Sequence, residues 1–305
     1  MPATPSCFEC LDERFRRLFI PTARLDTLFT GCRWAEGPAY FPAARSLVWS
    51  DIPNDRMLRL DACNGIVSVF RSPAGHSNGN TVDRSGRLVT CEHGGRRVSR
   101  TEFDGSVTTL VDRHDGKRLN SPNDVVVKSD HSIWFTDPTY GIDSDYEGHL
   151  AASEQAGNHV YRLDPAGGLR LVADDFVQPN GLAFSPDESL LYIVDTGRSH
   201  RPDGPAHIRK FTVSDGGTLR GGGIFADCQA GFFDGLRVDT SGRIWTSAGD
   251  GVHCYDPDGT LIGKILVPEV VANVCFGGQK RNYLYICGTT SLYGVRLPVN
   301  GAATF

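Results

Sequence analysis

Residues 180–195 read NGLAFSPDESLLYIVD: a polar residue opens a short strand pattern, and after a turn a second apolar strand ends in an acid. Comparable stretches occur six times along the chain. They are EGPAYFPAARSLVWSD (36–51), NGNTVDRSGRLVTCE (78–92), NDVVVKSDHSIWFTD (123–137), NGLAFSPDESLLYIVD (180–195), DGLRVDTSGRIWTSA (234–248) and NVCFGGQKRNYLYICG (273–288). The starts lie 42, 45, 57, 54 and 39 residues apart. A period of this size with several short strands per unit predicts a β-propeller of six blades.

Each unit is expected to form a blade of four antiparallel strands. In the first unit the strands are predicted at 36–41, 46–51, 57–61 and 66–70, and glycine-containing turns such as CNG at 63–65 separate the last two. The sixth unit has only three strand patterns, so ARLDTLF at 23–29 is predicted to supply its fourth strand and close the ring. The chain is therefore interpreted as an N-terminal extension (1–22), with a short helix expected within 11–19, and one all-β propeller domain (23–305).

The composition excludes several classes of protein. Of the 305 residues, 40% are hydrophobic, and the net charge of −5 comes from interspersed acids and bases, which argues against nucleic acid or an anionic membrane as a partner. No apolar run is long enough to span a membrane, and the N-terminus lacks the apolar core of a secretory signal. Nine cysteines at irregular spacings indicate reduced thiols in the cytoplasm. We expect a monomer or homodimer that binds a small molecule.

The repeat also predicts where a site would form. The innermost strand of each blade begins at one mouth of the channel, which gathers six polar residues into an inner ring: Glu36, Asn78, Asn123, Asn180, Asp234 and Asn273. The second strand is antiparallel, so the acids at its end form an outer arc at the same mouth: Asp51, Glu92, Asp137 and Asp195. Two long segments, 139–158 and 196–206, follow second strands and are expected to cover this mouth.

The inner ring has two interpretations. Asn-Gly and Asp-Gly are common turn dipeptides, so any one of these residues alone is more simply explained as a turn residue. Several polar side chains converging on one axis favour a cation, because buried carboxylates repel one another unless neutralised. The predicted ligands are two acids and two amides, Glu36, Asp234, Asn123 and Asn180. Oxygen donors without His or Cys favour Ca²⁺, with Mg²⁺, Mn²⁺ and Zn²⁺ as alternatives.

Several motifs make the sequence resemble the gluconolactonase/regucalcin (senescence marker protein) family. They are WAEGP (34–38), SPND (121–124), QPNGLAFSPD (178–187) and DGLRVD (234–239). CEHG (91–94) and WFTDP (134–138) are similar to its bacterial gluconolactonase branch. The likeness preserves order and spacing over roughly residues 25–297.

This resemblance implies a six-bladed propeller with one axial divalent metal that hydrolyses lactones. The metal-binding Glu, Asn and Asp of the family fall on Glu36, Asn180 and Asp234, and a further Asn that contacts metal or substrate falls on Asn123. The chain departs from the regucalcin-like pattern at Ser121, where those members have an Arg. The sugar contacts of that branch therefore do not transfer, and the identity of the lactone stays open.

A lactonase needs a polarised carbonyl and an activated water. Asp234 is predicted as the general base, and a role as metal ligand only is the alternative. The predicted substrate-binding residues are Asn78, Asn123, Glu92, His93, Asp137 and Tyr140. The sequence has no G-x-S-x-G motif for a serine hydrolase. Two other functions remain open at this point: a phosphotriesterase-like hydrolase on the same frame and a non-catalytic calcium-binding propeller.

Overall fold

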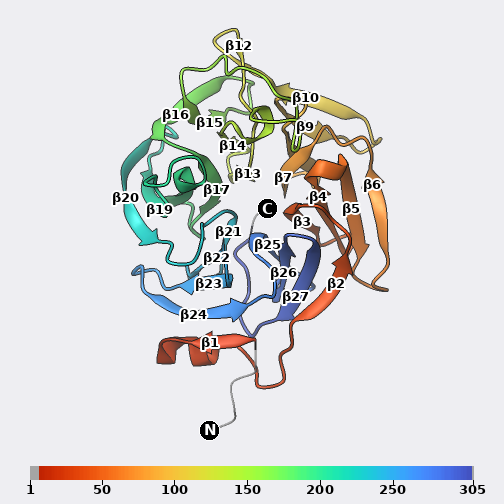
Figure 1. Cartoon of the computed structure of the whole chain (residues 1–305), viewed down its shortest axis with the longest axis vertical. Helices are drawn as coiled ribbons and strands as arrows, with labels where there is room; N and C mark the ends of the chain where they lie inside the picture. Colours follow the sequence, from red (N-terminus) through yellow and green to blue (C-terminus); the bar gives the residue numbers. More distant parts are fainter. Residues whose placement is uncertain (1–6, 304–305) are drawn as a thin grey trace.

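A computed structural model describes residues 7–303, so residues 1–6 of the predicted N-terminal extension lie outside the described part. Six antiparallel sheets surround a central axis (Figure 1). This architecture confirms the predicted six-bladed propeller. Within residues 7–303 no helix has the length and apolar character needed to cross a membrane.

The first strand of each blade is innermost and the later strands follow outward. Blade 1 contains β3 (Ala35–Phe41), β4 (Ser46–Asp51), β5 (Arg56–Asp61) and β6 (Val67–Arg71). Blade 2 contains β7 (Ser77–Val82), β8 (Leu88–Glu92), β9 (Arg97–Thr101) and β10 (Val107–Val111). Blade 3 contains β13 (Val125–Val127), β14 (Ile133–Asp137), β15 (Asn158–Leu163) and β16 (Leu169–Phe176).

The second half of the chain continues the same order. Blade 4 contains β17 (Pro179–Phe184), β18 (Leu190–Asp195), β19 (His207–Val213) and β20 (Leu219–Asp227). Blade 5 contains β21 (Leu236–Val238), β22 (Ile244–Ala248), β23 (Gly251–Tyr255) and β24 (Leu261–Leu266). Blade 6 contains β25 (Val271–Gly277), β26 (Tyr283–Gly288) and β27 (Ser291–Arg296). Outside the blades lie the hairpin β11 (Arg113–His114) and β12 (Lys117–Arg118) and the 3₁₀ turns η1 (Glu13–Arg17), η2 (Ile52–Asn54), η3 (Tyr140–Ile142) and η4 (Gly197–Ser199).

The ring closes as predicted. Strand β2 (Asp26–Thr30) pairs antiparallel with β27, with Thr27 opposite Tyr293 and Thr30 opposite Ser291. The N-terminal segment therefore provides the outer strand of blade 6 and covers its exposed edge. The first and last parts of the chain are thereby held in one sheet.

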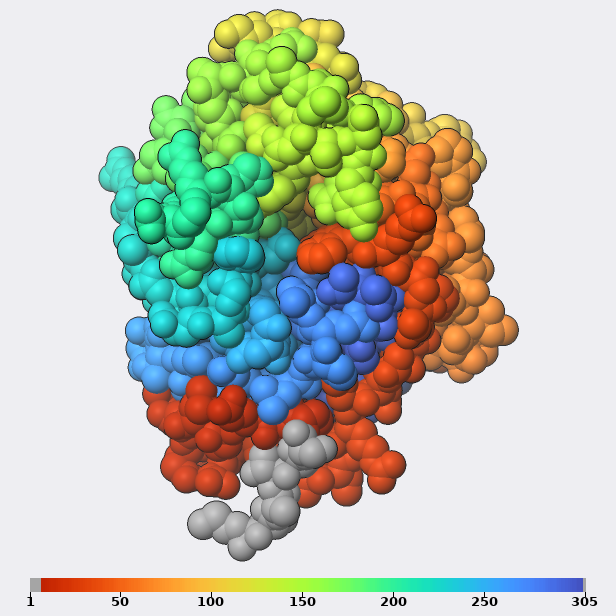
Figure 2. Space-filling view, in the orientation of Figure 1, coloured from red at the N-terminus to blue at the C-terminus, as the bar shows by residue number. Residues whose placement is uncertain are grey.

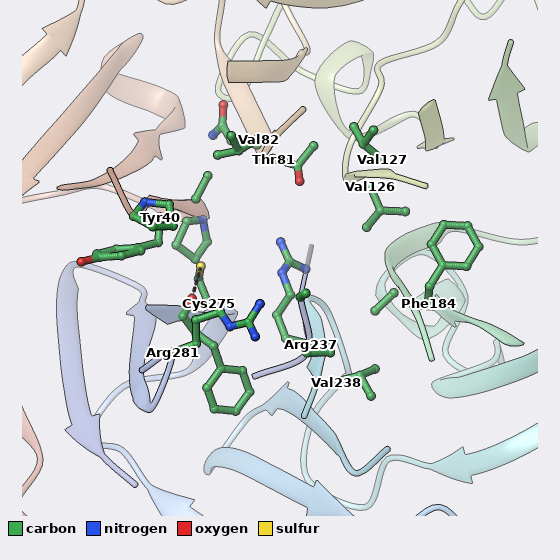
Figure 3. Close-up of a pocket in the computed structure, with 18 of the residues that line it drawn as sticks. Tyr40, Thr81, Val82, Val126, Val127, Phe184, Arg237, Val238, Cys275 and Arg281 are labelled. Carbon is green, nitrogen blue, oxygen red and sulfur yellow. Dashed lines mark hydrogen bonds between the residues drawn. The ribbon is translucent and has the colours of Figure 1, made fainter. Parts of the chain in front are cut away.

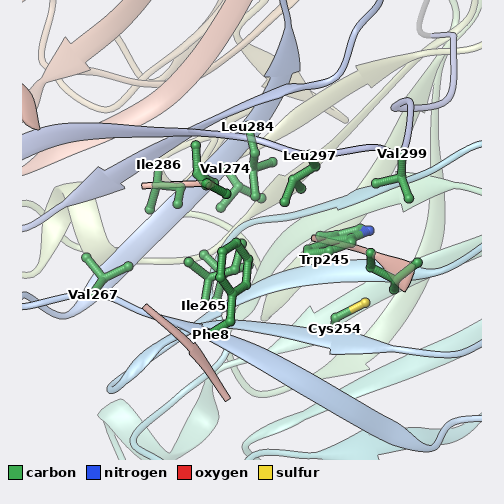
Figure 4. Packing of buried hydrophobic residues seen from close by; sticks show 14 of the residues in the cluster. Phe8, Trp245, Cys254, Ile265, Val267, Val274, Leu284, Ile286, Leu297 and Val299 are labelled. Atoms are coloured by element: carbon green, nitrogen blue, oxygen red, sulfur yellow. The ribbon is translucent and has the colours of Figure 1, made fainter. Parts of the chain in front are cut away.

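The N-terminal segment also contributes beyond the predicted closing strand. Strand β1 (Phe8–Cys10) pairs with β24 as a fifth strand of blade 5, and η1 follows where a short helix was expected. Phe15 of η1 is fully buried, with its ring centroid 6.2 Å from that of Trp245. Figure 4 shows the surrounding apolar cluster, in which Phe8 lies beside Ile265 and Trp245 lies near Leu297 and Val299. The cluster joins blades 5 and 6 through their facing side chains.

The innermost strands approach one another unusually closely. Each of four inner-ring residues is followed by a glycine, and a Cβ on that glycine would overlap the next blade: 2.0 Å from Asn78 O for Gly37, 2.4 Å from Asn123 O for Gly79, 2.2 Å from Asp234 O for Gly181 and 2.0 Å from Asn273 Cγ for Gly235. Backbone hydrogen bonds join neighbouring blades at the same level, from Gly79 N to Asn123 O (2.7 Å) and from Gly181 N to Asp234 O (3.1 Å). These dipeptides are therefore required by close approach, and the simple turn explanation is insufficient.

The pairing of the innermost strands is irregular at the inner-ring residues. Register shifts occur in β3 between Glu36 and Ala39, in β7 between Ser77 and Asn80, in β17 between Pro179 and Leu182 and in β25 between Val271 and Asn273. An irregularity of this kind redirects side chains that strict alternation would send to one face of the blade. In blades 3 and 5 the inner strand begins only after the inner-ring residue.

We expect Gly181→Ala to destabilise the propeller by about 2–3 kcal/mol, because the new methyl group would meet backbone atoms that cannot rotate away. Gly223→Ala is the matched control, since nothing lies within 4 Å of its added Cβ. Urea unfolding of both variants measures the difference. Equal stabilities would contradict the close approach described here.

Candidate functional site

Three carboxylates lie together at the axis. Glu36 is 2% exposed, and its Oε2 accepts a hydrogen bond from Asn273 Nδ2 at 3.0 Å. Its Oε1 is buried and has no hydrogen-bond partner among residues 7–303. Asp124 is also buried, and its Oδ2 lies 3.5 Å from Arg237 Nη1. Asp234 is partly accessible, and the Asn180 amide hydrogen-bonds to it.

The negative charges of these three carboxylates repel one another. Burial, followed by the charge of Asp124, raises the pKa of Glu36 to about 8. Burial also raises the pKa of Asp234, and the carboxylates of Glu36, Asp124 and Glu147 add to that shift. Ionised Glu36, Asp124 and Asp234 together with Arg237 leave a local charge of about −2. A divalent cation would neutralise this charge.

The predicted ligand set fits such an ion. Glu36, Asn123, Asn180 and Asp234 all stand at or just before the start of an innermost strand, and together they offer two carboxylates and two amides. Among residues 7–303 no cluster of three or more His, Cys, Asp or Glu side chains is arranged as a metal site. The predicted ligand set contains only two acids, and amide oxygens would complete it. Glu36 Oε1 is buried without a hydrogen-bond partner, so it is the atom that a bound cation would most directly satisfy.

Two acids of this region were missed by sequence reasoning. Asp124 occupies the position after the inner-ring residue where four other units have glycine, and this exchange of N-G for N-D in the motif SPND was the available signal. Its Oδ1 would contact a Cβ on Gly79 at 2.7 Å, so the side chain fills the space beside blade 2. Glu147 comes from the long loop after β14, and no pattern in the sequence indicates that it approaches the axis.

His93 links that loop to the inner ring. Its Nδ1 lies 3.2 Å from the backbone carbonyl of Glu147, and its Nε2 lies 3.2 Å from Asn78 Nδ2. Because a carbonyl only accepts, Nδ1 carries the proton, and Nε2 then accepts from the Asn78 amide. Burial lowers the pKa of His93 to about 4, so the ring is neutral at neutral pH. The arrangement commits Asn78 Nδ2 to His93 and leaves Asn78 Oδ1 as the atom available to a ligand.

The acids of the outer arc mostly hold the backbone. Asp51, Asp137 and Asp195 accept hydrogen bonds from the backbone N–H groups of Arg33 (2.8 Å), Asn120 (2.8 Å) and Gln178 (2.9 Å), in the segments that lead into the innermost strands. Glu92 differs, because Arg97 Nε at 2.7 Å and Ser99 Oγ at 2.5 Å engage its two oxygens. Glu92 and Asp137, both predicted as substrate-binding residues, are thus buried. Both oxygens of Glu92 are bonded within the protein, whereas Asp137 is bonded through Oδ2 and its Oδ1 has no partner among residues 7–303.

The two long loops lie at the mouth and touch each other. The hydroxyls of Tyr140 and Ser199 are 2.9 Å apart, and His200 Nε2 lies 2.8 Å from Asp143 Oδ2. Gly141 N donates to Ser121 Oγ at 2.9 Å, which anchors the first loop beside Asn123. In Figure 2 the yellow-green loop (138–157) and the green loop (196–206) narrow the central opening. Burial, and to a lesser extent the Asp234 carboxylate, raises the pKa of Tyr140, which places this residue within the electrostatic reach of the axial acids.

Several known proteins resemble this chain in sequence or in fold. The profile described as "SMP-30/Gluconolactonase/LRE-like region" matches residues 34–290. A gluconolactonase from Zymomonas mobilis is 29% identical over 91% of this chain and 82% of its own length. A pentonolactonase from Haloferax volcanii is 31% identical over 84% of this chain and 82% of its own length. The solved structure of a gluconolactonase from Xanthomonas campestris is 41% identical, with a TM-score of 0.90 over 98% of both chains.

We expect the stability of the calcium-treated protein to depend on pH through Asp137. Burial raises the pKa of Asp137 to about 7, so the protonated carboxyl stabilises the fold fully below about pH 4, and this contribution is lost as the pH rises through about 7. Between pH 5 and pH 8 the free energy of unfolding should therefore fall by about 2 kcal/mol less in Asp137→Asn than in wild type. Urea unfolding at both pH values tests this, and identical losses in the two proteins would contradict it.

Proposed function

This chain belongs to the SMP-30/Gluconolactonase/LRE-like family, and from that membership we propose that it hydrolyses sugar lactones with the help of one bound divalent cation. The observation that carries the proposal is the meeting of Glu36, Asp124 and Asp234 at the axis with Arg237 as their counter-ion. Relatives named for gluconolactone, pentonolactone and 6-deoxy-6-sulfogluconolactone support a sugar lactone as the substrate class.

Glu36, Asn123, Asn180 and Asp234 are the residues that would hold the cation. An all-oxygen donor set with amides suits Ca²⁺ best, and Mg²⁺, Mn²⁺ and Zn²⁺ are the alternatives to be compared with it. When bound, a divalent ion supplies Lewis-acid polarisation of the ester carbonyl. The remaining chemistry falls to side chains of the chain itself.

Asp234 is proposed to accept the proton of the attacking water. The water oxygen bonds to the carbonyl carbon, the ring C–O bond breaks, and the departing ring oxygen takes up a proton to give the hydroxy acid. Asp234 suits this role because it is the axial acid that remains partly accessible. A role as ligand only is the alternative for this residue.

The other predicted residues are assigned by their surroundings. Asn78, oriented by His93, and Asn123 offer amide groups to substrate hydroxyls, and Tyr140 offers its hydroxyl from the loop. Glu92 and Asp137 are proposed to position the neighbouring backbone and side chains. Ser121 stands where a regucalcin-like chain has Arg and bonds to Gly141 N and Pro138 O, so here the loop occupies that part of the site.

The state of the cysteine thiols is relevant to the cellular compartment in which the protein works. All nine thiols are unpaired in the structure, and six of them are buried. Unpaired thiols are usual in a reducing environment, which supports the proposal that the protein works in the cytoplasm.

Removal of the cation tests the proposed function directly. We expect protein dialysed against EDTA to hydrolyse gluconolactone and a pentonolactone at least about 100-fold more slowly, with activity restored by Ca²⁺. Adding Mg²⁺, Mn²⁺ or Zn²⁺ to the EDTA-treated protein instead shows how much activity each ion restores. Full activity after chelation would overturn the metal role, and calcium binding without turnover of any lactone would favour a non-catalytic propeller.

The role of Asp234 can be separated from metal binding. We expect Asp234→Asn to lower kcat at least about 100-fold while calcium affinity, measured by titration calorimetry, changes little, because an amide oxygen remains available as a ligand. Asp174→Asn is the matched control, since Asp174 is exposed on the outer strand β16. A parallel loss of calcium affinity and kcat would indicate that Asp234 is a ligand only.

A further inference from the structure

A cavity lies at the mouth of the central channel opposite the axial acids. Its walls come mainly from the far ends of the innermost strands of all six blades, and Ala302 and Ala303 also line it, whereas the axial acids stand where these strands begin. Figure 3 shows Val82, Val126, Phe184 and Val238 around its edge. Apart from Arg237, which reaches Asp124, no residue of the proposed lactonase site lines it, and the walls are largely apolar.

The centre of this cavity is cationic. Arg237 is 9% exposed and points into the space, and Arg281 extends toward it from the turn between β25 and β26 (Figure 3). Arg237 Nη1 contacts Leu236 O at 2.6 Å and lies 3.5 Å from Asp124 Oδ2, whereas its Nε and Nη2 have no protein acceptor among residues 7–303. Within the same part of the chain, no carboxylate pairs with the Arg281 guanidinium.

The three arginines of the lining differ in how closely a carboxylate approaches them. Arg84 Nη2 lies 2.8 Å from Glu188 Oε1, so its charge is already neutralised. Arg237, whose acidic neighbour Asp124 lies 3.5 Å away, and Arg281, which has no carboxylate partner among residues 7–303, form the cationic centre of a cavity with largely apolar walls. The guanidinium N–H groups of Arg237 and Arg281 that no protein acceptor engages are available to an anion that enters the cavity, and the planar fork of a guanidinium suits a carboxylate.

We propose that this cavity binds a small organic carboxylate with an apolar body. The carboxylate meets Arg237 and Arg281, and the body lies against Val126, Phe184 and Val238. Apolar walls with a few converging polar groups are the usual make-up of a small-molecule site. This site is separate from lactone hydrolysis and does not depend on it.

Benzoate is the probe, tested by titration calorimetry against the calcium-loaded full chain. We expect saturable binding of benzoate and at least about ten-fold weaker binding of benzamide, which has the same ring without the charge. Inorganic phosphate, which lacks an apolar body, should also bind more weakly. Equal binding of benzoate and benzamide, or no saturable binding of benzoate, would overturn the proposal.

Three variants locate the binding. Arg281→Asn, which tolerates the positive φ of 51° at this position, and the cavity-filling Val126→Phe should each weaken benzoate binding about ten-fold or more. Arg220→Asn, on the exposed outer strand β20, should bind as wild type. Loss of binding in Arg220→Asn, or unchanged binding in both cavity variants, would place benzoate elsewhere and refute the site.

Arg237 gives the cavity a connection to the axial acids through Asp124. A carboxylate on Arg237 offsets its positive charge, so benzoate should tighten Ca²⁺ binding about five-fold, and Ca²⁺ should tighten benzoate binding equally. This consequence rests on the proposed cation site as well. Benzoate binding that leaves Ca²⁺ affinity unchanged would refute the coupling while the cavity assignment stands.

Discussion

The close contact between innermost strands is the constraint on which the rest of the structure depends. Four inner-ring residues are followed by glycines whose added Cβ would stand 2.0–2.4 Å from the next blade, where three would meet backbone and the fourth, Gly235, the Asn273 side chain. This contact leaves no space for apolar side chains between the strand starts. The polar side chains there are consequently turned toward the axis and packed together, although their charges oppose one another.

The same packing divides the channel into two unlike halves. At one mouth the carboxylates of Glu36, Asp124 and Asp234 gather beneath the two long loops. At the other mouth Arg237 and Arg281 face a cavity with apolar walls. The ion pair between Asp124 and Arg237 lies between these regions and compensates part of the charge of each. A cation on one side and an anion on the other would each relieve an unbalanced charge that the protein alone leaves in place.

The periodic features of the sequence were sufficient to predict the architecture. The repeated starts from Glu36 to Asn273 predicted six blades, and the missing strand of the last unit predicted closure by 23–29, which the pairing of β2 with β27 confirms. The added strand β1 was not predicted, because three residues at the edge of blade 5 carry no repeat signal. Asp124 and Glu147 were missed for a related reason: one departs from its repeat, and the other lies in a loop outside every repeat.

The sequence by itself determined the fold class, the ring of polar strand starts and the family resemblance, since each depends on local patterns that recur at a regular interval. Only the tertiary structure decided which of those polar groups are free to act. Asp137 and Glu92 are indistinguishable from ligand-binding acids in a strand pattern, yet one accepts a backbone N–H and the other binds Arg97 and Ser99. The physical reason is that hydrogen-bond partners and counter-ions come from distant segments, whose distances no local pattern encodes.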